Sequence, residues 1–205
     1  MMGAPTIMLE KISHGSESVL ALRTLEDRLG EKAGATMPIE CGGINSMMPL
    51  FTAAKAGLPC VDADGMGRAF PELQMETFYV YGVSSCPMSI AAPDGSTVVI
   101  DTGDDAHAME WISRGVTIRL GGASHIADYP MRGADVKRTA IPRTISLGLQ
   151  LGRCIRVARE RHRNPFEALR AELSTTLYRH GIELFRGKVT DVARRTEGGF
   201  VRGDV

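Results

Sequence analysis

Apolar residues recur at helical spacing in several separate stretches of the chain. Between 16 and 29, Val19, Leu22, Leu25 and Leu29 fall on one face, with Ser16 positioned as the N-cap. The same periodicity predicts further helices at 45–56, 104–120, 143–161 and 165–177. The last of these opens with Asn164 as the cap and Pro165 at the first helical position.

Shorter apolar runs between these helices predict strands. Runs at 35–40 and 59–63 flank one helix, which is the pattern of a βαβ unit with two parallel strands. Runs at 88–92 and 97–101 flank the turn triplet Pro93-Asp94-Gly95 and predict a hairpin. From 181 onward, alternation around a Gly-Gly pair at 198–199 predicts two antiparallel strands.

This order predicts an α/β fold, a three-layer α/β/α domain with a mostly parallel sheet. The change in pattern near Gly181 places a domain boundary there. We therefore expect a domain over 1–180 and, over 181–205, the first strands of a truncated β-rich domain.

Composition narrows the class of protein. The chain has 205 residues, 43% of them hydrophobic, and 24 basic against 24 acidic side chains, so one sizeable core is expected and no general attraction to nucleic acid or anionic membrane. No stretch has the apolar length of a membrane span, and a cytoplasmic location is the default expectation. The four cysteines form no C-x-x-C pair, which argues against a zinc or disulfide framework.

Polar residues gather where the two strands of the βαβ unit end. In open parallel sheets, ligands bind beyond the carboxyl ends of the strands. The first strand runs into ECGGINS and the second into VDADGMGRAFPE. The candidate site residues at these ends are Glu40, Gly42, Gly43, Asn45, Ser46, Asp62, Asp64, Arg68 and Glu72.

Each group in this crevice has a chemical use. Carboxylates accept protons or bind a metal, Arg68 binds an anionic or carbonyl oxygen, and the N–H groups after Gly43 begin a helix that attracts anions. Lys137 is a further ligand-binding candidate from a later helix. The structural alternative is that Asp64 caps a local turn, Arg68 pairs with Glu72 and the two glycines are an ordinary connection.

The segment GGINSMMPLFTAAKAGLPCVDADGMGRAFPELQM resembles the signature of the S-methyl thiohydantoin desulfurase family. The likeness extends to MMGAP, YPMRGADVKRTAIPRTISLGLQLGR and LFRGKVTDVARRTEGGF, and so covers almost the whole chain. It implies an N-terminal α/β domain followed by a smaller β-barrel-like domain. Family members also begin with a Gly-rich turn, and this chain has no counterpart to that turn.

The resemblance implies a hydrolytic desulfurase acting on S-methyl thiohydantoin or a related cyclic amide. In that hypothesis Asp64 or Asp62 is the general base, Glu72 the partner acid, and Arg68 stabilises developing negative charge. A divalent metal on Asp62, Asp64 and Glu40 is the variant, and the sequence identifies no cofactor.

A second hypothesis is a non-catalytic ligand-binding or accessory subunit of a hydantoinase or oxoprolinase system, because genes of this family lie beside such enzymes. The partners considered are a hydantoin-like small molecule, a second copy of the chain, and a hydantoinase or oxoprolinase. A clear difference between the pKa values of Asp64 and Glu72 would favour the enzymatic hypothesis over the accessory-subunit hypothesis.

Overall fold

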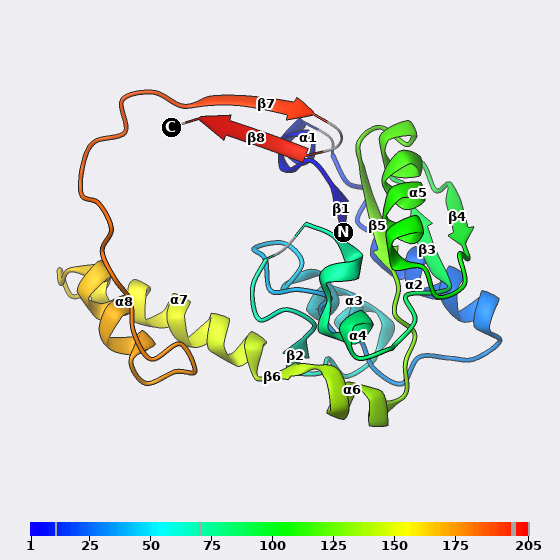
Figure 1. The fold of residues 1–205 in the computed structure, drawn as a ribbon, viewed down its shortest axis with the longest axis horizontal. Helices are drawn as coiled ribbons and strands as arrows, with labels where there is room; N and C mark the ends of the chain where they lie inside the picture. The colour runs from blue at the N-terminus through cyan, green and yellow to red at the C-terminus, as the bar shows by residue number, and fades with distance from the viewer. Residues whose placement is uncertain (11, 70, 198–199, 205) are drawn as a thin grey trace.

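The computed structural model describes residues 1–10, 12–69, 71–197 and 200–204 (Figure 1). Its helices are α1 (Pro5–Glu10), α2 (Glu17–Leu29), α3 (Met48–Ala56), η1 (Leu73–Met75), α4 (Thr77–Val80), α5 (Ala106–Arg119), α6 (Gly133–Thr139), α7 (Thr144–Glu160) and α8 (Pro165–Leu173). Its strands are β1 (Met2–Gly3), β2 (Ala63–Asp64), β3 (Met88–Ala91), β4 (Thr97–Ile100), β5 (Ala123–Ala127), β6 (Ile141–Pro142), β7 (Ala193–Glu197) and β8 (Phe200–Asp204).

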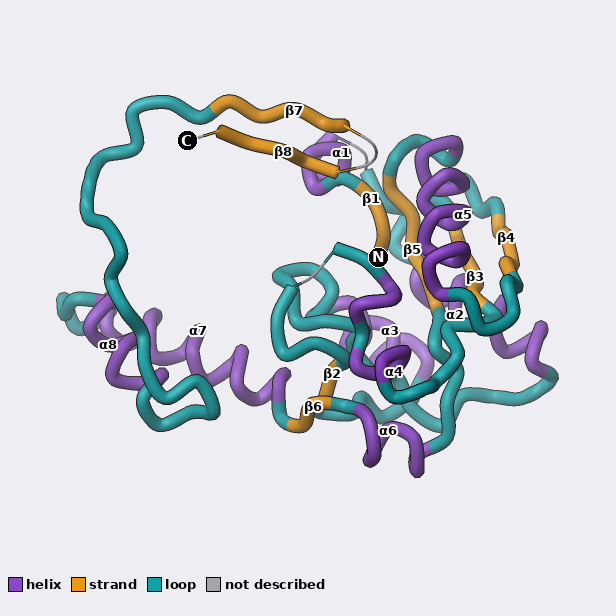
Figure 2. Tube along the Cα trace, viewed as in Figure 1, coloured by secondary structure: helices purple, strands orange, loops and turns teal. Residues whose placement is uncertain are grey.

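The main sheet has four strands in the order β1-β5-β3-β4, and each neighbouring pair is antiparallel. Strand β3 is buried along its whole length, as a central strand covered on both faces must be. The Ser89 hydroxyl donates to the Ala21 carbonyl of α2 at 2.6 Å, while Met88 and Ile90 share an apolar cluster with Met109 of α5. Helices α2 and α5 therefore lie on opposite sides of the sheet (Figure 2).

The predicted parallel sheet is not confirmed. The two segments that were expected to form its strands meet only at a parallel bridge between Thr36 and Cys60. Strand β2 is two residues long and pairs antiparallel with β6 instead. The physical reason is that the apolar runs at 35–40 and 59–63 lie outside the four-stranded sheet. The second strand of that sheet, β5, comes from residues for which no strand was predicted.

Several other predictions are confirmed. The hairpin pairs Met88 with Ile100 and Ala91 with Thr97. Helices α2, α5, α7 and α8 form close to the predicted ranges, and the Asn164 side chain accepts from the backbone N–H groups of Phe166 and Glu167 at the start of α8. In the terminal segment β7 and β8 pair antiparallel, while the predicted turn at 198–199 lies outside the described residues.

The C-terminal part of the chain leaves the α/β body. Helix α7 leads away from it, α8 folds back against α7, and an irregular segment then returns to the β7–β8 hairpin (Figure 1). These two strands form a separate two-stranded sheet. No closed barrel is present among the described residues, so the expected start of a barrel-like domain is not confirmed.

Candidate functional site

Three segments of the chain meet at Gly65. The Gly65 N–H donates to the Ile39 carbonyl at 2.9 Å, and the Gly65 carbonyl accepts from the Thr77 N–H at 2.7 Å. Each of the three segments carries an acidic residue next to this junction, namely Glu40, Asp64 and Glu76. The three carboxyl groups are brought together by backbone pairing, although they are far apart in the sequence.

All three acidic side chains are buried, with exposed fractions of 7% for Glu40, 0% for Asp64 and 2% for Glu76. Buried carboxyl groups are uncommon because removing the charged form from water is costly. We call Glu40, Asp64 and Glu76 the carboxyl cluster.

Asp64 is held by the turn that follows it. The Gly67 N–H lies 2.8 Å from Oδ1 and 3.0 Å from Oδ2 of Asp64. Gly67 has a φ of 70°, a left-handed conformation that glycine adopts without strain. Asp64 therefore does cap a local turn, as the alternative interpretation of the sequence predicted. The same hydrogen bonds hold its carboxylate in the cluster.

Glu40 is held by the Gly-Gly turn and the residue after it. Its Oε1 accepts from Asn45 Nδ2 at 2.5 Å, and its Oε2 accepts from the Gly42 N–H. Asn45 Nδ2 also lies 3.2 Å from the Met1 carbonyl. Burial raises the pKa of Glu40 above its ordinary value, while these hydrogen bonds act in the opposite direction.

Glu76 differs from its two neighbours because its Oε2 is buried without a hydrogen-bond partner among the described residues. Burial, followed by the negative charges of Asp128, Asp64 and Glu40, raises the pKa of Glu76 to about 10. At neutral pH the group is therefore a carboxylic acid carrying a proton. A neutral acid beside ionisable carboxylates is the arrangement from which enzymes assign acid and base roles.

Asp128 adds a fourth acidic group near the cluster. Its Oδ2 is buried without a hydrogen-bond partner in the described part of the chain, and burial raises the pKa of Asp128 to about 7. The next residue, Tyr129, donates its hydroxyl to the Leu73 carbonyl at 2.7 Å. This contact ties the loop after β5 to the segment that precedes Glu76.

Comparison with known proteins gives the family. Residues 1–102 match the model of the S-Me-THD-like N-terminal domain, and residues 104–205 match that of the S-Me-THD-like C-terminal domain. The chain belongs to the S-Me-THD-like family. The two models meet between residues 102 and 104, and the domain boundary near Gly181 stays a prediction.

A crystal structure of a protein from Chromobacterium violaceum is similar to this S-Me-THD-like chain, with a TM-score of 0.75 and 27% sequence identity over 86% of the chain. The chain spans about half of that protein, 49% of its length. No curated protein gives a significant match. Within the described residues, no helix combines the length and apolar character needed to cross a membrane.

The structure brings some of the predicted site residues together. Glu40, Gly42, Asn45 and Asp64 lie in or against the carboxyl cluster. Ser46 donates its backbone N–H to the Gly42 carbonyl at 3.0 Å and so helps to close the same turn.

Other predicted residues lie elsewhere. The Asp62 carboxylate accepts from the Ser146 N–H at 3.0 Å and from its hydroxyl at 2.5 Å, at the start of α7. Glu72 accepts from Gln74 Nε2 at 2.5 Å. Gly43, Arg68 and Lys137 are solvent-exposed. Their proposed catalytic and binding roles stay predictions, and the geometry favours Glu76 over Glu72 as the acid.

Sequence reasoning missed Glu76 and Asp128. The available signal for Glu76 was a lone charge in the otherwise mainly apolar stretch LQMETFYV. Burial, together with the charges of Asp64 and Glu40, raises the pKa of Cys41 to about 11, so the thiol stays protonated.

Two further observations limit what the site does. No group of three or more His, Cys, Asp or Glu side chains within the described ranges could hold a metal ion, so the proposed metal on Asp62, Asp64 and Glu40 has no support. A cavity of about 520 Å³ lies between α7 and α8, and none of the predicted site residues lines it. We base the candidate site on the carboxyl cluster because it contains the perturbed acidic groups.

Proposed function

We propose that the carboxyl cluster carries out hydrolytic desulfuration of an S-methyl thiohydantoin or a related cyclic amide. The observation that supports this function is the protonated Glu76, whose free Oε2 lies among acidic groups on Asp64 and Glu40. Membership of the S-Me-THD-like family supports the substrate class.

The reaction needs water and no other reactant. The ring carbon that bears the methylthio group lies between two nitrogens and is electrophilic. Water oxygen forms a bond to this carbon, and the carbon–sulfur bond then breaks with its electron pair leaving on sulfur. One proton of the water ends on sulfur, giving methanethiol, and the other ends on the ring nitrogen, giving the hydantoin.

Glu76 suits the role of proton donor in this reaction. A neutral carboxylic acid can donate to the ring nitrogen as water attacks, which increases the electrophilic character of the carbon. The raised pKa keeps the proton available at neutral pH, where an ordinary glutamate would have lost it.

Asp64 suits the complementary role of proton acceptor. Its carboxylate is fixed by the Gly67 N–H, so its free lone pairs have a defined direction. Glu40, bound by Asn45, provides a second negative charge that orients the water and maintains the high pKa of Glu76. This assignment places acid and base on adjacent backbone segments.

The test is turnover of S-methyl thiohydantoin by the 205-residue chain, with release of methanethiol followed by a thiol reagent. Glu76→Gln keeps the shape of the side chain and removes the proton donor, and we expect a rate loss of about 100-fold or more. Glu31→Gln is the matched control, because Glu31 forms an exposed ion pair with Arg132. An unchanged rate in Glu76→Gln would exclude the proposed role of Glu76.

The alternative of a ligand-binding or accessory subunit is favoured by one observation. The described cavities lie along α8 and do not include the buried carboxyl cluster. Binding of the hydantoin product or the thiohydantoin by calorimetry, without methanethiol release from the wild-type chain, would establish the accessory function and overturn the hydrolytic one.

A further inference from the structure

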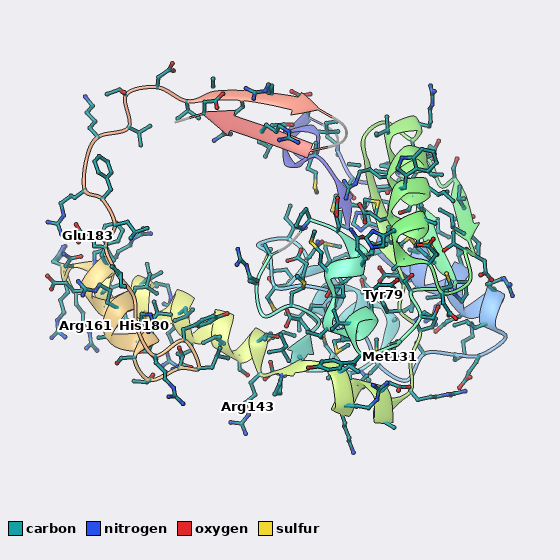
Figure 3. All side chains as sticks on the ribbon, viewed as in Figure 1. Tyr79, Met131, Arg143, Arg161, His180 and Glu183 are labelled. Atoms are coloured by element: carbon teal, nitrogen blue, oxygen red, sulfur yellow. The ribbon has the colours of Figure 1, made fainter. Side chains whose placement is uncertain are left out.

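Residues 143–180, which form helices α7 and α8 and the turns around them, are strongly basic. We call this segment the α7–α8 arm. It contains eight arginines and three glutamates, a formal charge of +5 in a chain whose net charge is zero. The rest of the chain therefore carries −5. Helix α7 packs chiefly against α8, so this charge lies outside the α/β body. Arg143, Arg161 and His180 of the arm are labelled in Figure 3.

A cavity of about 520 Å³ lies between the two helices of the arm. This volume is in the range of small-molecule binding sites. Its apolar lining includes Leu149, Val157, Ala168 and Ala158, the last of which is only 3% exposed. The polar lining consists of Ser146, Gln150, Arg153, Cys154, Arg161, Arg163 and Glu172.

The arginines that line the cavity differ from other arginines of the arm in the groups with which they form ion pairs or hydrogen bonds. Arg156, on the same helix, forms an ion pair with Glu160 at 3.0 Å, and Arg170 donates to the Gly181 carbonyl at 3.1 Å. In the described ranges, Arg153, Arg161 and Arg163 form no ion pair with a carboxylate of the chain. Three guanidinium groups thus face one cavity without an internal counter-ion.

One carboxylate also lines the cavity. Oε1 of Glu172 accepts a hydrogen bond from Gln150 Nε2, which holds this side chain against the wall formed by α7. The cavity therefore has three positive groups and one negative group, and an excess of positive charge. Guanidinium groups bind carboxylate and phosphate through paired hydrogen bonds, because their donors match the spacing of two oxygens.

We propose that this cavity binds a small organic anion. Its carboxylate or phosphate group contacts Arg153, Arg161 and Arg163, and its apolar part lies against Leu149 and Val157. The concave shape and the apolar wall favour a small molecule over nucleic acid, because none of the described side chains that line the cavity is aromatic and available for base stacking. The site is separate from the carboxyl cluster and does not depend on the proposed hydrolysis.

The experiment is isothermal titration calorimetry of the 205-residue chain with phenyl phosphate and with benzoate, and with benzyl alcohol as the neutral probe. We expect both anions to bind and benzyl alcohol to bind at least about tenfold more weakly. The tighter of the two anions identifies the group that the arginines prefer. Affinity for both anions should fall as chloride rises, because chloride competes for exposed guanidinium groups.

Three variants locate the site. Arg153→Gln and Arg163→Gln remove one charge each while keeping most of the side chain, and each should weaken anion binding about tenfold or more. Arg156→Gln is the matched control on the same helix, since Arg156 does not line the cavity, and it should change the affinity less than threefold. Thermal unfolding of each variant checks that the fold is intact.

Several results would overturn the proposal. These are equal affinity in a variant with all three arginines replaced, equal binding of benzyl alcohol, or an equal loss in Arg156→Gln. Binding of a DNA oligonucleotide without binding of either small anion would also overturn it. So would self-association that the triple replacement abolishes in the absence of anion binding, because the arm would then be a surface for another chain.

Discussion

The Oε2 atom of Glu76 lies against the backbone of Gly65, so close that a β-carbon added at Gly65 would fall 2.1 Å from it. The same β-carbon would lie 2.7 Å from Cε2 of Phe78 and 3.0 Å from the Ile39 carbonyl oxygen. Position 65 therefore requires glycine because a β-carbon would not fit there. Backbone conformation is not the reason, since the φ of Gly65 is not in the left-handed region. The close approach lets Asp64 and Glu76 lie in one cluster.

Gly65→Ala should destabilise the fold by about 2–3 kcal/mol, because a buried contact of this kind forces side chains and backbone apart. Phe78 is 1% exposed and cannot move into solvent without opening the core. The measurement is the free energy of unfolding in urea. Gly43→Ala is the control, as no atom lies within 4 Å of its added β-carbon, and it should change the stability by less than about 0.5 kcal/mol.

The protonation of Glu76 predicts how stability depends on pH. The folded-state pKa of about 10 lies above the ordinary value of 4.5, so the folded protein retains a proton that the unfolded chain releases. This contribution to stability is fully present below pH 4.5 and is lost as pH rises toward 10. The loss is about 1.4 kcal/mol per pH unit for one fully shifted group.

Glu76→Gln replaces the neutral acid by a neutral amide and should reduce this decline. We expect wild type and variant to have similar unfolding free energies near pH 5, and the variant to be the more stable near pH 9. Urea unfolding at the two pH values makes the comparison. Parallel curves for the two proteins would mean that Glu76 ionises in the folded state as it does in the unfolded chain.

The fold was partly predictable because local signals decide many of its elements. The turn at Pro93-Asp94-Gly95 specifies the hairpin, and the side chain of Asn164 with Pro165 specifies the start of α8. Strand β5 was not predicted, because it directly follows Gly121-Gly122 and because Ser124 and His125 leave it without a continuous apolar run. Its antiparallel pairing with β3 is a long-range choice that no local pattern records.

The candidate site, like the fold, could be predicted only in part from the sequence. Glu40 and Asn45 are joined by a turn within one motif, so their proximity follows from the sequence. Glu76 joins the carboxyl cluster, and Asp128 lies near it, through tertiary contacts of Gly65 and Tyr129 that sequence spacing does not reveal. Asp62 was predicted to lie in the site because it is at the carboxyl end of the expected strand at 59–63, but its carboxylate accepts hydrogen bonds from Ser146 at the start of α7 instead.

This contact makes Asp62 a structural partner of α7. Its carboxylate satisfies the N–H of Ser146, one of the groups that an α-helix leaves free in its first turn. Asp62→Ala should lower the free energy of unfolding by about 1 kcal/mol. Asp62→Asn keeps an acceptor and should lose less, which separates the hydrogen bond from the charge when both variants are measured by urea unfolding.

The hydrogen bonds to Asp62, outweighing its burial, hold its pKa below the ordinary value of 3.8. Its contribution to stability is therefore present above about pH 4 and is lost as pH falls below that value. The difference between wild type and Asp62→Ala should accordingly disappear in acid. A difference between the two proteins that does not shrink as pH falls below about 4 would show that the loss has another cause.

Asn45 tests whether the carboxyl cluster depends on a neutral donor. Asn45→Asp keeps the side-chain shape, but replaces the Nδ2 group that donates to Glu40 by a second carboxyl oxygen. At neutral pH the half-buried side chain at position 45 would then place a second carboxylate against the buried Glu40, so we expect a loss of about 2–3 kcal/mol in unfolding free energy. The loss should shrink near pH 4, where one of the pair binds a proton and the donor is restored.

The matched control for this change is Asn164→Asp. Asn164 accepts from the N–H groups that begin α8, and aspartate serves equally well in that position. The control should therefore change stability by less than about 0.5 kcal/mol at neutral pH. If Asn45→Asp behaved like this control, Nδ2 of Asn45 would not be the group that stabilises Glu40, and the cluster would have to tolerate a further negative charge.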